Sequence, residues 1–122
     1  MNPMKILVVE DEMIIARELT CALRELGYEP VGHARTGEQA IELAGTLHPD
    51  LVLMDIHLAS AMDGITASLA IKNQYAVPSV FLSAFTGDDS LARAKAAEPV
   101  GYLPKPFEEH ELLAVLDAAL KK

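Results

Sequence analysis

Short apolar runs alternate along the chain with longer stretches in which apolar residues return every three or four positions. Short runs of large apolar residues are typical of strands buried on both faces of a parallel sheet, and the longer spacing is typical of amphipathic helices. Five strand–helix units with short links predict one α/β domain, a parallel sheet with helices on both faces. The expected strands are Lys5–Val9, Glu29–Ala34, Leu51–Met54, Val80–Leu82 and Gly101–Leu103.

Capping residues mark the ends of the expected helices. Gly27 fits the C-terminal end of a first helix in which Leu19 and Leu23 recur at helical spacing. Thr36 can cap the second helix. Cys21 lies in the first helix, where we expect a small packing residue rather than a reactive thiol. The later helices are expected over 64–74, from Asp88 through Ala97, and over Glu108–Leu120.

Polar residues follow four of the expected strands. Glu10 and Asp11 follow the first strand, Asp55 the third, Ser83 the fourth and Lys105 the fifth. Because the carboxyl ends of parallel strands meet at one edge of a sheet, we expect these side chains to lie close together. Taken singly, Glu10 and Asp11 are better explained by capping of the first helix and Ser83 by a turn, and Lys105 could be one more surface lysine. The joint pattern favours a site.

The residue types indicate which chemistry such a site supports. Crowded carboxylates repel one another, and either a proton or a bound cation must relieve them. Oxygen-only ligands suit a hard ion, Mg²⁺ in particular. An aspartate can also attack phosphorus and form an aspartyl phosphate, a reaction that needs positive charge or hydrogen-bond donors on the transferred oxygens. Asp11, Asp55, Ser83 and Lys105 provide those parts.

Composition limits the protein class. At 122 residues the chain is one domain, 1–122, with a single core. Its formal net charge of −8 argues against direct binding to nucleic acid, which requires a basic surface. No apolar run reaches the roughly 18 residues of a membrane span, and the start lacks the basic and apolar regions of a signal peptide. The single cysteine excludes an internal disulfide. We therefore expect a soluble cytoplasmic protein that does not act at a membrane.

Five segments together resemble the receiver domain of two-component response regulators, and the resemblance covers essentially the whole chain. It implies a flavodoxin-like, doubly wound (βα)5 domain with five parallel strands in the order 2-1-3-4-5. The chain ends at its last expected helix, so no output domain is expected within it. The segments that carry the resemblance are 6–12, 51–55, 62–64, 81–84 and 101–107.

The resemblance implies a role for each strand-end residue. Asp55 is similar to the phosphoacceptor, and Asp11 to a direct ligand of Mg²⁺ or Mn²⁺. Glu10, in place of the commoner aspartate, would hold a metal-bound water, and the backbone carbonyl of His57 would be a third protein ligand. Asp55 would then receive a phosphoryl group from the phosphohistidine of a sensor histidine kinase or a histidine phosphotransfer protein.

The remaining positions would stabilise the phosphoryl group, change conformation in response to it, or set its lifetime. Lys105, expected to precede a cis peptide bond, and Ser83 would each contact a phosphoryl oxygen. Ser83 and Tyr102 would form the switch that alters the surface of the fourth helix, fifth strand and fifth helix. Phe85 and His57 occupy the positions at which the family tunes phosphoryl lifetime, and we hypothesise that Phe85 screens the group from water. The family also requires a small residue next to the phosphoryl group, here Ala84.

The favoured function is a phosphorylation-dependent signalling switch, not an enzyme beyond its own phosphotransfer and slow autodephosphorylation. Its implied partners are the kinase, a downstream target or output domain, and a second copy in a phosphorylation-linked homodimer. A phosphorylation-independent, receiver-like scaffold is the first alternative. An aspartyl-phosphate phosphatase of the haloacid-dehalogenase type is the second, although that family wants an acid where His57 stands. The loop from Ile56 to Asp63 departs from the commonest receiver form: it lacks the usual proline and is one residue longer.

Overall fold

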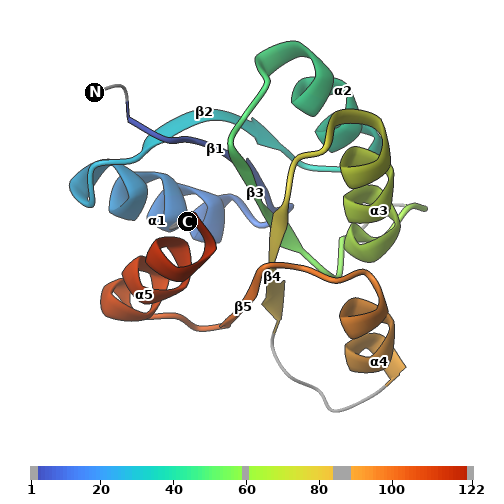
Figure 1. The fold of residues 1–122 in the computed structure, drawn as a ribbon. Coiled ribbons are helices and arrows are strands. Elements are labelled where there is room, and N and C mark those ends of the chain that lie inside the picture. Colours follow the sequence, from blue (N-terminus) through green and yellow to red (C-terminus); the bar gives the residue numbers. More distant parts are fainter. Residues whose placement is uncertain (1–2, 59–60, 84–88, 121–122) are drawn as a thin grey trace.

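The computed structural model of the chain describes residues 3–58, 61–83 and 89–120 (Figure 1). Five parallel strands form one sheet in the order β2-β1-β3-β4-β5, as the resemblance implied. The strands are β1 Lys5–Val9, β2 Glu29–Ala34, β3 Leu51–Asp55, β4 Ser79–Ser83 and β5 Gly101–Pro104. The helices are α1 Met13–Glu25, α2 Gly37–Leu47, α3 Gly64–Tyr75, α4 Asp89–Ala96 and α5 Glu109–Leu120.

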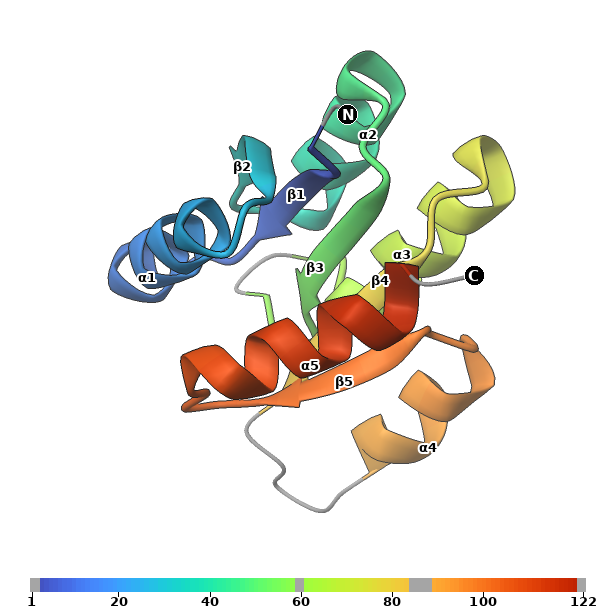
Figure 2. The same ribbon diagram turned by 60° about the vertical axis from the view of Figure 1, so that its left-hand side comes forward.

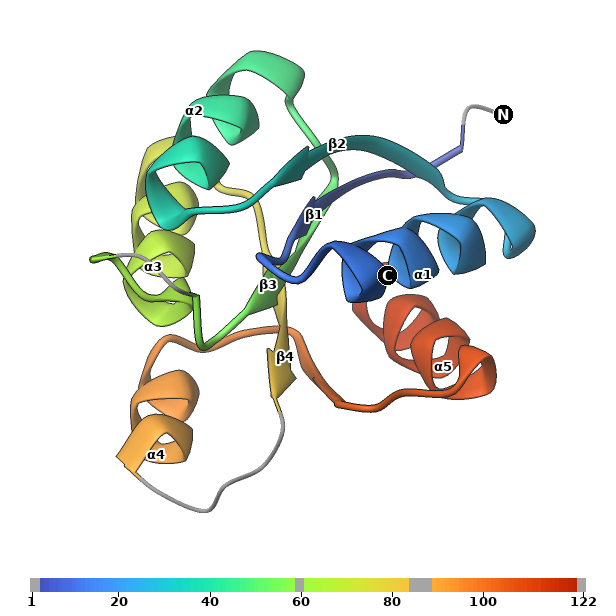
Figure 3. The same ribbon diagram turned by 180° about the vertical axis from the view of Figure 1, so that it is seen from behind.

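The helices cover both faces of the sheet. Figure 3 shows α2, α3 and α4 on one side of the strands and α1 with α5 on the other, and Figure 2 shows α5 lying along β5. Two buried apolar clusters fill the spaces between these layers. Alternate strand residues enter opposite clusters, because successive side chains of a strand point to opposite faces. In β1, for example, Leu7 and Val9 pack under α2 and α3, whereas Ile6 and Val8 pack under α1 and α5.

Local capping holds the helix ends as the sequence predicted. Gly27 adopts a left-handed φ of 93° just after α1, and Thr36 Oγ1 accepts a hydrogen bond of 3.0 Å from the Gln39 N–H at the start of α2. The prediction for Cys21 is wrong, because its side chain is exposed. Cys21 lies two positions from the buried Leu19, and two positions along a helix turn a side chain to roughly the opposite side.

Several element boundaries differ by one residue from the expected ones. β3 and β4 each extend one residue further, so that Asp55 and Ser83 end their strands instead of following them. Pairing with neighbouring strands accounts for this: the Ile56 N–H donates to the Leu82 carbonyl at 3.2 Å, and the Lys105 N–H to the Ser83 carbonyl at 2.8 Å. Asp88, expected to open the fourth helix, lies outside the described residues, and α4 begins at Asp89.

Candidate functional site

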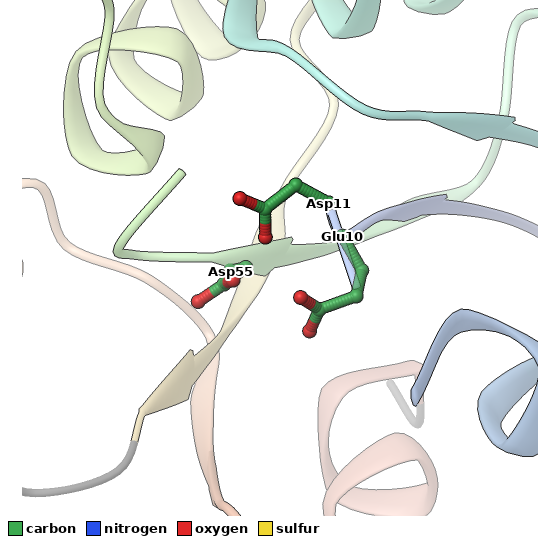
Figure 4. Close-up of side chains that lie close together, drawn as sticks. All are labelled: Glu10, Asp11 and Asp55. Carbon is green, nitrogen blue, oxygen red and sulfur yellow. The ribbon is translucent and has the colours of Figure 1, made fainter. Parts of the chain in front are cut away.

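Three carboxylates meet at the C-terminal edge of the sheet. Glu10 and Asp11 follow β1, and Asp55 ends the neighbouring strand β3. One oxygen from each side chain lies within 4.8 Å of the other two, and Figure 4 shows the three groups gathered at the ends of these strands. Glu10 is fully buried and Asp55 is 2% exposed, whereas Asp11 is half-buried. Parallel pairing of β1 with β3 therefore brings together acids that are far apart in the chain.

Lys105 places one ammonium group among these acids. Its Nζ lies 3.0 Å from Glu10 Oε1 and 3.4 Å from Asp55 Oδ2, and its side chain is only 14% exposed. The backbone hydrogen bond from Lys105 to Ser83 fixes the chain just after β5, and the Lys105–Pro106 peptide bond is cis, as expected. One ammonium facing three carboxylates leaves uncompensated negative charge.

The protonation of Glu10 reflects this crowding. Burial, followed by the charge of Asp55, raises the pKa of Glu10 from 4.5 to about 7, against the opposing effects of Lys105 and of the Glu12 N–H, which donates to Glu10 Oε2 at 3.2 Å. For Lys105, burial lowers the pKa, but the contacts with Glu10 and Asp55 outweigh burial and the net shift is upward. Lys105 is thus a cation at neutral pH. The carboxyl group of Glu10, in contrast, gains or loses its proton near neutral pH.

The donor set fits a hard divalent cation. Glu10 Oε1 is buried, and it has the ammonium of Lys105, 3.0 Å away, as a partner among the described residues. A buried carboxylate oxygen in that position is costly unless a proton, a cation or bound water satisfies it. Mg²⁺ and Mn²⁺ take carboxylate oxygens and keep several waters, which suits a cluster that has one half-buried member, Asp11.

His57 and Gly64 shape the chain just after Asp55. The His57 N–H donates to Asp55 Oδ1 at 3.1 Å, and the His57 side chain is exposed. Gly64 begins α3 directly against the Asp55 carbonyl oxygen, with which any Cβ at this position would collide. Its own N–H donates to the Ile56 carbonyl at 3.0 Å. From the sequence, Gly64 was expected to begin a helix and to belong to a segment of the family resemblance, with no close approach to Asp55 predicted. The short segment Met62-Asp63-Gly64 was the available signal for this close approach.

Ser83 and Tyr102 lie on the two strands beyond Asp55. Asp55 pairs with Leu82, so Ser83 is one residue further along the adjacent strand, and it is 8% exposed. Tyr102 is half-buried and pairs with Phe81, the two ring centroids lying 6.3 Å apart at an interplanar angle of 51°. The predicted modulators Ala84 and Phe85 lie outside the described residues, and the functional roles assigned to Ser83, Tyr102 and His57 stay predictions.

Two clefts flank the acids. A cleft of about 460 Å³ between α1 and the segment after β5 is lined by Lys105, Phe107 and Ile15, among others. A second, of about 450 Å³, lies beside the start of α2 and is lined by Asp11, Arg35, Thr36 and Gln39. Asp55 itself is nearly buried, but its neighbours Lys105 and Asp11 each open onto one of these clefts. The site is therefore reached from the rim of the sheet.

Comparison with known proteins gives a consistent result. The chain matches the response regulator receiver domain over residues 6–117. It is 40% identical over 120 residues to the transcriptional regulatory protein PdtaR of Mycobacterium tuberculosis, and 32% identical over 117 residues to the phyllosphere-induced regulator PhyR of Methylorubrum extorquens. The alignments cover 98% and 95% of this chain but 58% and 43% of those relatives. The chain thus spans about half the length of the curated relatives it matches.

Solved structures agree. The signal receiver domain of a modulated diguanylate cyclase from Desulfovibrio desulfuricans has a TM-score of 0.91 and 32% identity, over 97% of this chain and 94% of that one. The receiver domain of the sensor histidine kinase PA1611 from Pseudomonas aeruginosa, which has a magnesium ion coordinated in its active-site cleft, has a TM-score of 0.87 and 31% identity, over 98% and 99%.

Fold and site first define the class: a doubly wound α/β protein with an acidic site at the C-terminal edge of its sheet. The chain belongs to the response regulator receiver domain family. The relatives named above are regulatory proteins, in keeping with a role in two-component signalling. Across the described ranges, no helix combines the length and the apolar character needed to cross a bilayer.

Proposed function

We propose that this domain is a phosphorylation-dependent switch in which Asp55 accepts a phosphoryl group from the phosphohistidine of a sensor histidine kinase or a histidine phosphotransfer protein. One observation carries the proposal. The Asp55 carboxylate lies 3.4 Å from the ammonium of Lys105, and it shares a cluster of oxygens within 4.8 Å of one another with Glu10 and Asp11. This arrangement combines a nucleophilic oxygen, a fixed cation and an oxygen-rich cation site.

The acids would hold Mg²⁺ or Mn²⁺, which when bound supplies positive charge to the phosphoryl oxygens. Asp11 and Asp55 would be direct ligands, with the His57 backbone carbonyl as the third protein ligand. Glu10, whose Oε1 already lies 3.0 Å from the ammonium of Lys105, would hold a metal-bound water rather than bind the ion directly. A family member with magnesium in its active-site cleft supports this proposal.

The transfer itself needs little covalent chemistry from the protein. A carboxylate oxygen of Asp55 forms a bond to phosphorus while the phosphorus–nitrogen bond of the phosphohistidine breaks and its electron pair returns to the imidazole ring. Lys105 is already placed beside Asp55 Oδ2 to balance charge on the transferred oxygens, and the Ser83 hydroxyl would donate to another of them. The domain would catalyse only this step and the slow hydrolysis in which water removes the phosphoryl group from Asp55 as inorganic phosphate.

The output would be a change in the surface formed by α4, β5 and α5. Ser83 would move toward the phosphoryl group, and Tyr102 would turn into the space behind it. Such a change is a population shift, limited by how much better the phosphorylated site stabilises the second state. The recipient of this signal would be a separate protein, a second copy of the chain, or an output domain. The longer curated relatives, of which the chain covers 58% and 43%, are in keeping with an output domain.

Incubation with Mg²⁺ and acetyl phosphate, followed by intact mass measurement, tests the proposal. We expect a gain of one phosphoryl group in the wild type and none in Asp55→Asn. Asp117→Asn, which changes an exposed acid on α5, is the matched control and should be phosphorylated normally. Steady turnover of added phosphomonoesters would instead indicate a phosphatase. Absence of any uptake, from acetyl phosphate or from a phosphorylated histidine donor, would favour a phosphorylation-independent scaffold.

A further inference from the structure

The backbone that carries the two acids of β1 is anchored to strand β2. In the parallel ladder Val8 pairs with His33 and Val9 with Ala34, and the Glu10 N–H donates to the Ala34 carbonyl at 3.0 Å. The regular pairing of β2 ends at Ala34, since Thr36 already serves as the N-cap of α2. The carbonyl of Glu10 is therefore left beyond the end of the ladder, at the point where the acidic loop begins.

A side chain of β2 binds that carbonyl. His33 Nε2 lies 2.7 Å from the Glu10 carbonyl oxygen, and the His33 side chain is half-buried. A carbonyl oxygen can only accept, so Nε2 must carry the hydrogen in this contact. The Glu10 carbonyl belongs to the same planar peptide as the Asp11 N–H, and holding it fixes the direction in which the chain enters Asp11.

We infer that His33 is a positioning residue for the acidic site. By holding the Glu10 carbonyl, His33 sets the spacing of the Glu10 and Asp11 carboxylates and thereby the preference of the site for Mg²⁺. The three acids repel one another, and a loosely held β1–α1 loop would relieve the repulsion by moving apart. The bonds to Ala34 and His33 oppose this movement from the side of the loop remote from Asp55. The identity of the ion rests on the proposed function, whereas the restraint on the loop does not.

Rigidity in this loop bears on which ion binds. Mg²⁺ demands a compact, nearly octahedral arrangement of oxygens, whereas Ca²⁺ accepts longer distances and flexible geometry. Loss of the His33 hydrogen bond should therefore weaken Mg²⁺ binding more than Ca²⁺ binding. A merely structural role for His33 would lower protein stability without changing the ratio of the two affinities.

Two variants of His33 and one control test the inference. His33→Leu removes the donor, and His33→Gln replaces it with an amide N–H of similar reach. His110→Leu makes the same change at an exposed histidine of α5. By NMR titration we expect His33→Leu to weaken Mg²⁺ binding about fivefold, as for the loss of one hydrogen bond, and Ca²⁺ binding less. His33→Gln should return to within about twofold of wild type, and the control should be unchanged. Unchanged Mg²⁺ affinity in His33→Leu, or no rescue by His33→Gln, would overturn the inference.

A measurement on metal-free protein separates this inference from the proposed function. The amide resonances of Asp11 and Glu12 report on the loop directly. In metal-free protein they should shift, and exchange faster with solvent, in His33→Leu but not in His33→Gln. If wild type binds no divalent ion, the proposed function fails, and these amides still decide whether His33 restrains the loop. If the amides of His33→Leu match those of wild type, the restraint is refuted whatever the site binds.

Discussion

Replacing Glu10 with glutamine should stabilise the metal-free protein at neutral pH, and the gain should shrink as the pH falls. Glu10 is fully buried, and burial together with the charge of Asp55 raises its pKa from 4.5 to about 7. Ionising this side chain therefore costs more in the folded protein than in the unfolded chain. Glutamine keeps the shape of the side chain without the charge.

The direction in which the free energy of unfolding changes with pH follows from the number of protons bound to Glu10 in the folded and unfolded states. Below pH 4.5 the Glu10 carboxyl is protonated in both the folded and the unfolded chain. Between pH 4.5 and about 7 the unfolded chain releases this proton while the folded protein keeps it, so the free energy of unfolding falls as the pH rises. Above that range both states are ionised and the loss is complete. At about 1.4 kcal/mol per pKa unit, the loss has an upper limit between about 3 and 4 kcal/mol.

Urea unfolding of wild type and Glu10→Gln from about pH 5 to pH 8, with EDTA present, measures this loss. Subtracting one curve of unfolding free energy against pH from the other cancels the contributions of the histidines and other groups that titrate in the same range. Glu18→Gln, an exposed acid of α1, is the control and should follow wild type. With excess Mg²⁺, wild type should lose most of the pH dependence that Glu10 causes, because an ion bound to the folded state favours the ionised carboxylates. If the free energies of unfolding of wild type and Glu10→Gln differ by the same amount at every pH, the reasoning is refuted.

Three further predictions concern single positions. Gly64→Ala should destabilise the fold by about 2 kcal/mol or more in urea unfolding, because its Cβ would meet the Asp55 carbonyl oxygen; wild-type stability would contradict the close approach. Ser79→Ala should raise the free energy of unfolding by about 1 kcal/mol, because the buried Oγ has no hydrogen-bond partner among the described residues; a loss would show that a partner exists. Phe85→Ala should speed loss of the phosphoryl group from Asp55, and an equal or slower decay rate would discard the screening hypothesis.

The secondary structure was largely predictable because it depends on residues close together in the chain. Alternating apolar runs placed β1 and β2 at their observed bounds, and Gly27 and Thr36 marked real helix ends. The errors arose where a neighbour across the structure decides the outcome. Asp55 belongs to its strand because β4 continues the ladder beside it, and Cys21 is exposed because of the face that α1 turns to the sheet.

By itself the sequence determined the strand order through its family resemblance, and determined which residue types stand at each strand end. Only the tertiary structure decided which atoms meet there. Lys105 contacts both Glu10 and Asp55, the Glu10 carboxyl is sealed from water, and His33 holds the peptide that leads into Asp11. Periodicity in a sequence reports on positions a few residues apart. Distances between strands depend on register and packing, and these set the charge and the pKa values of the site.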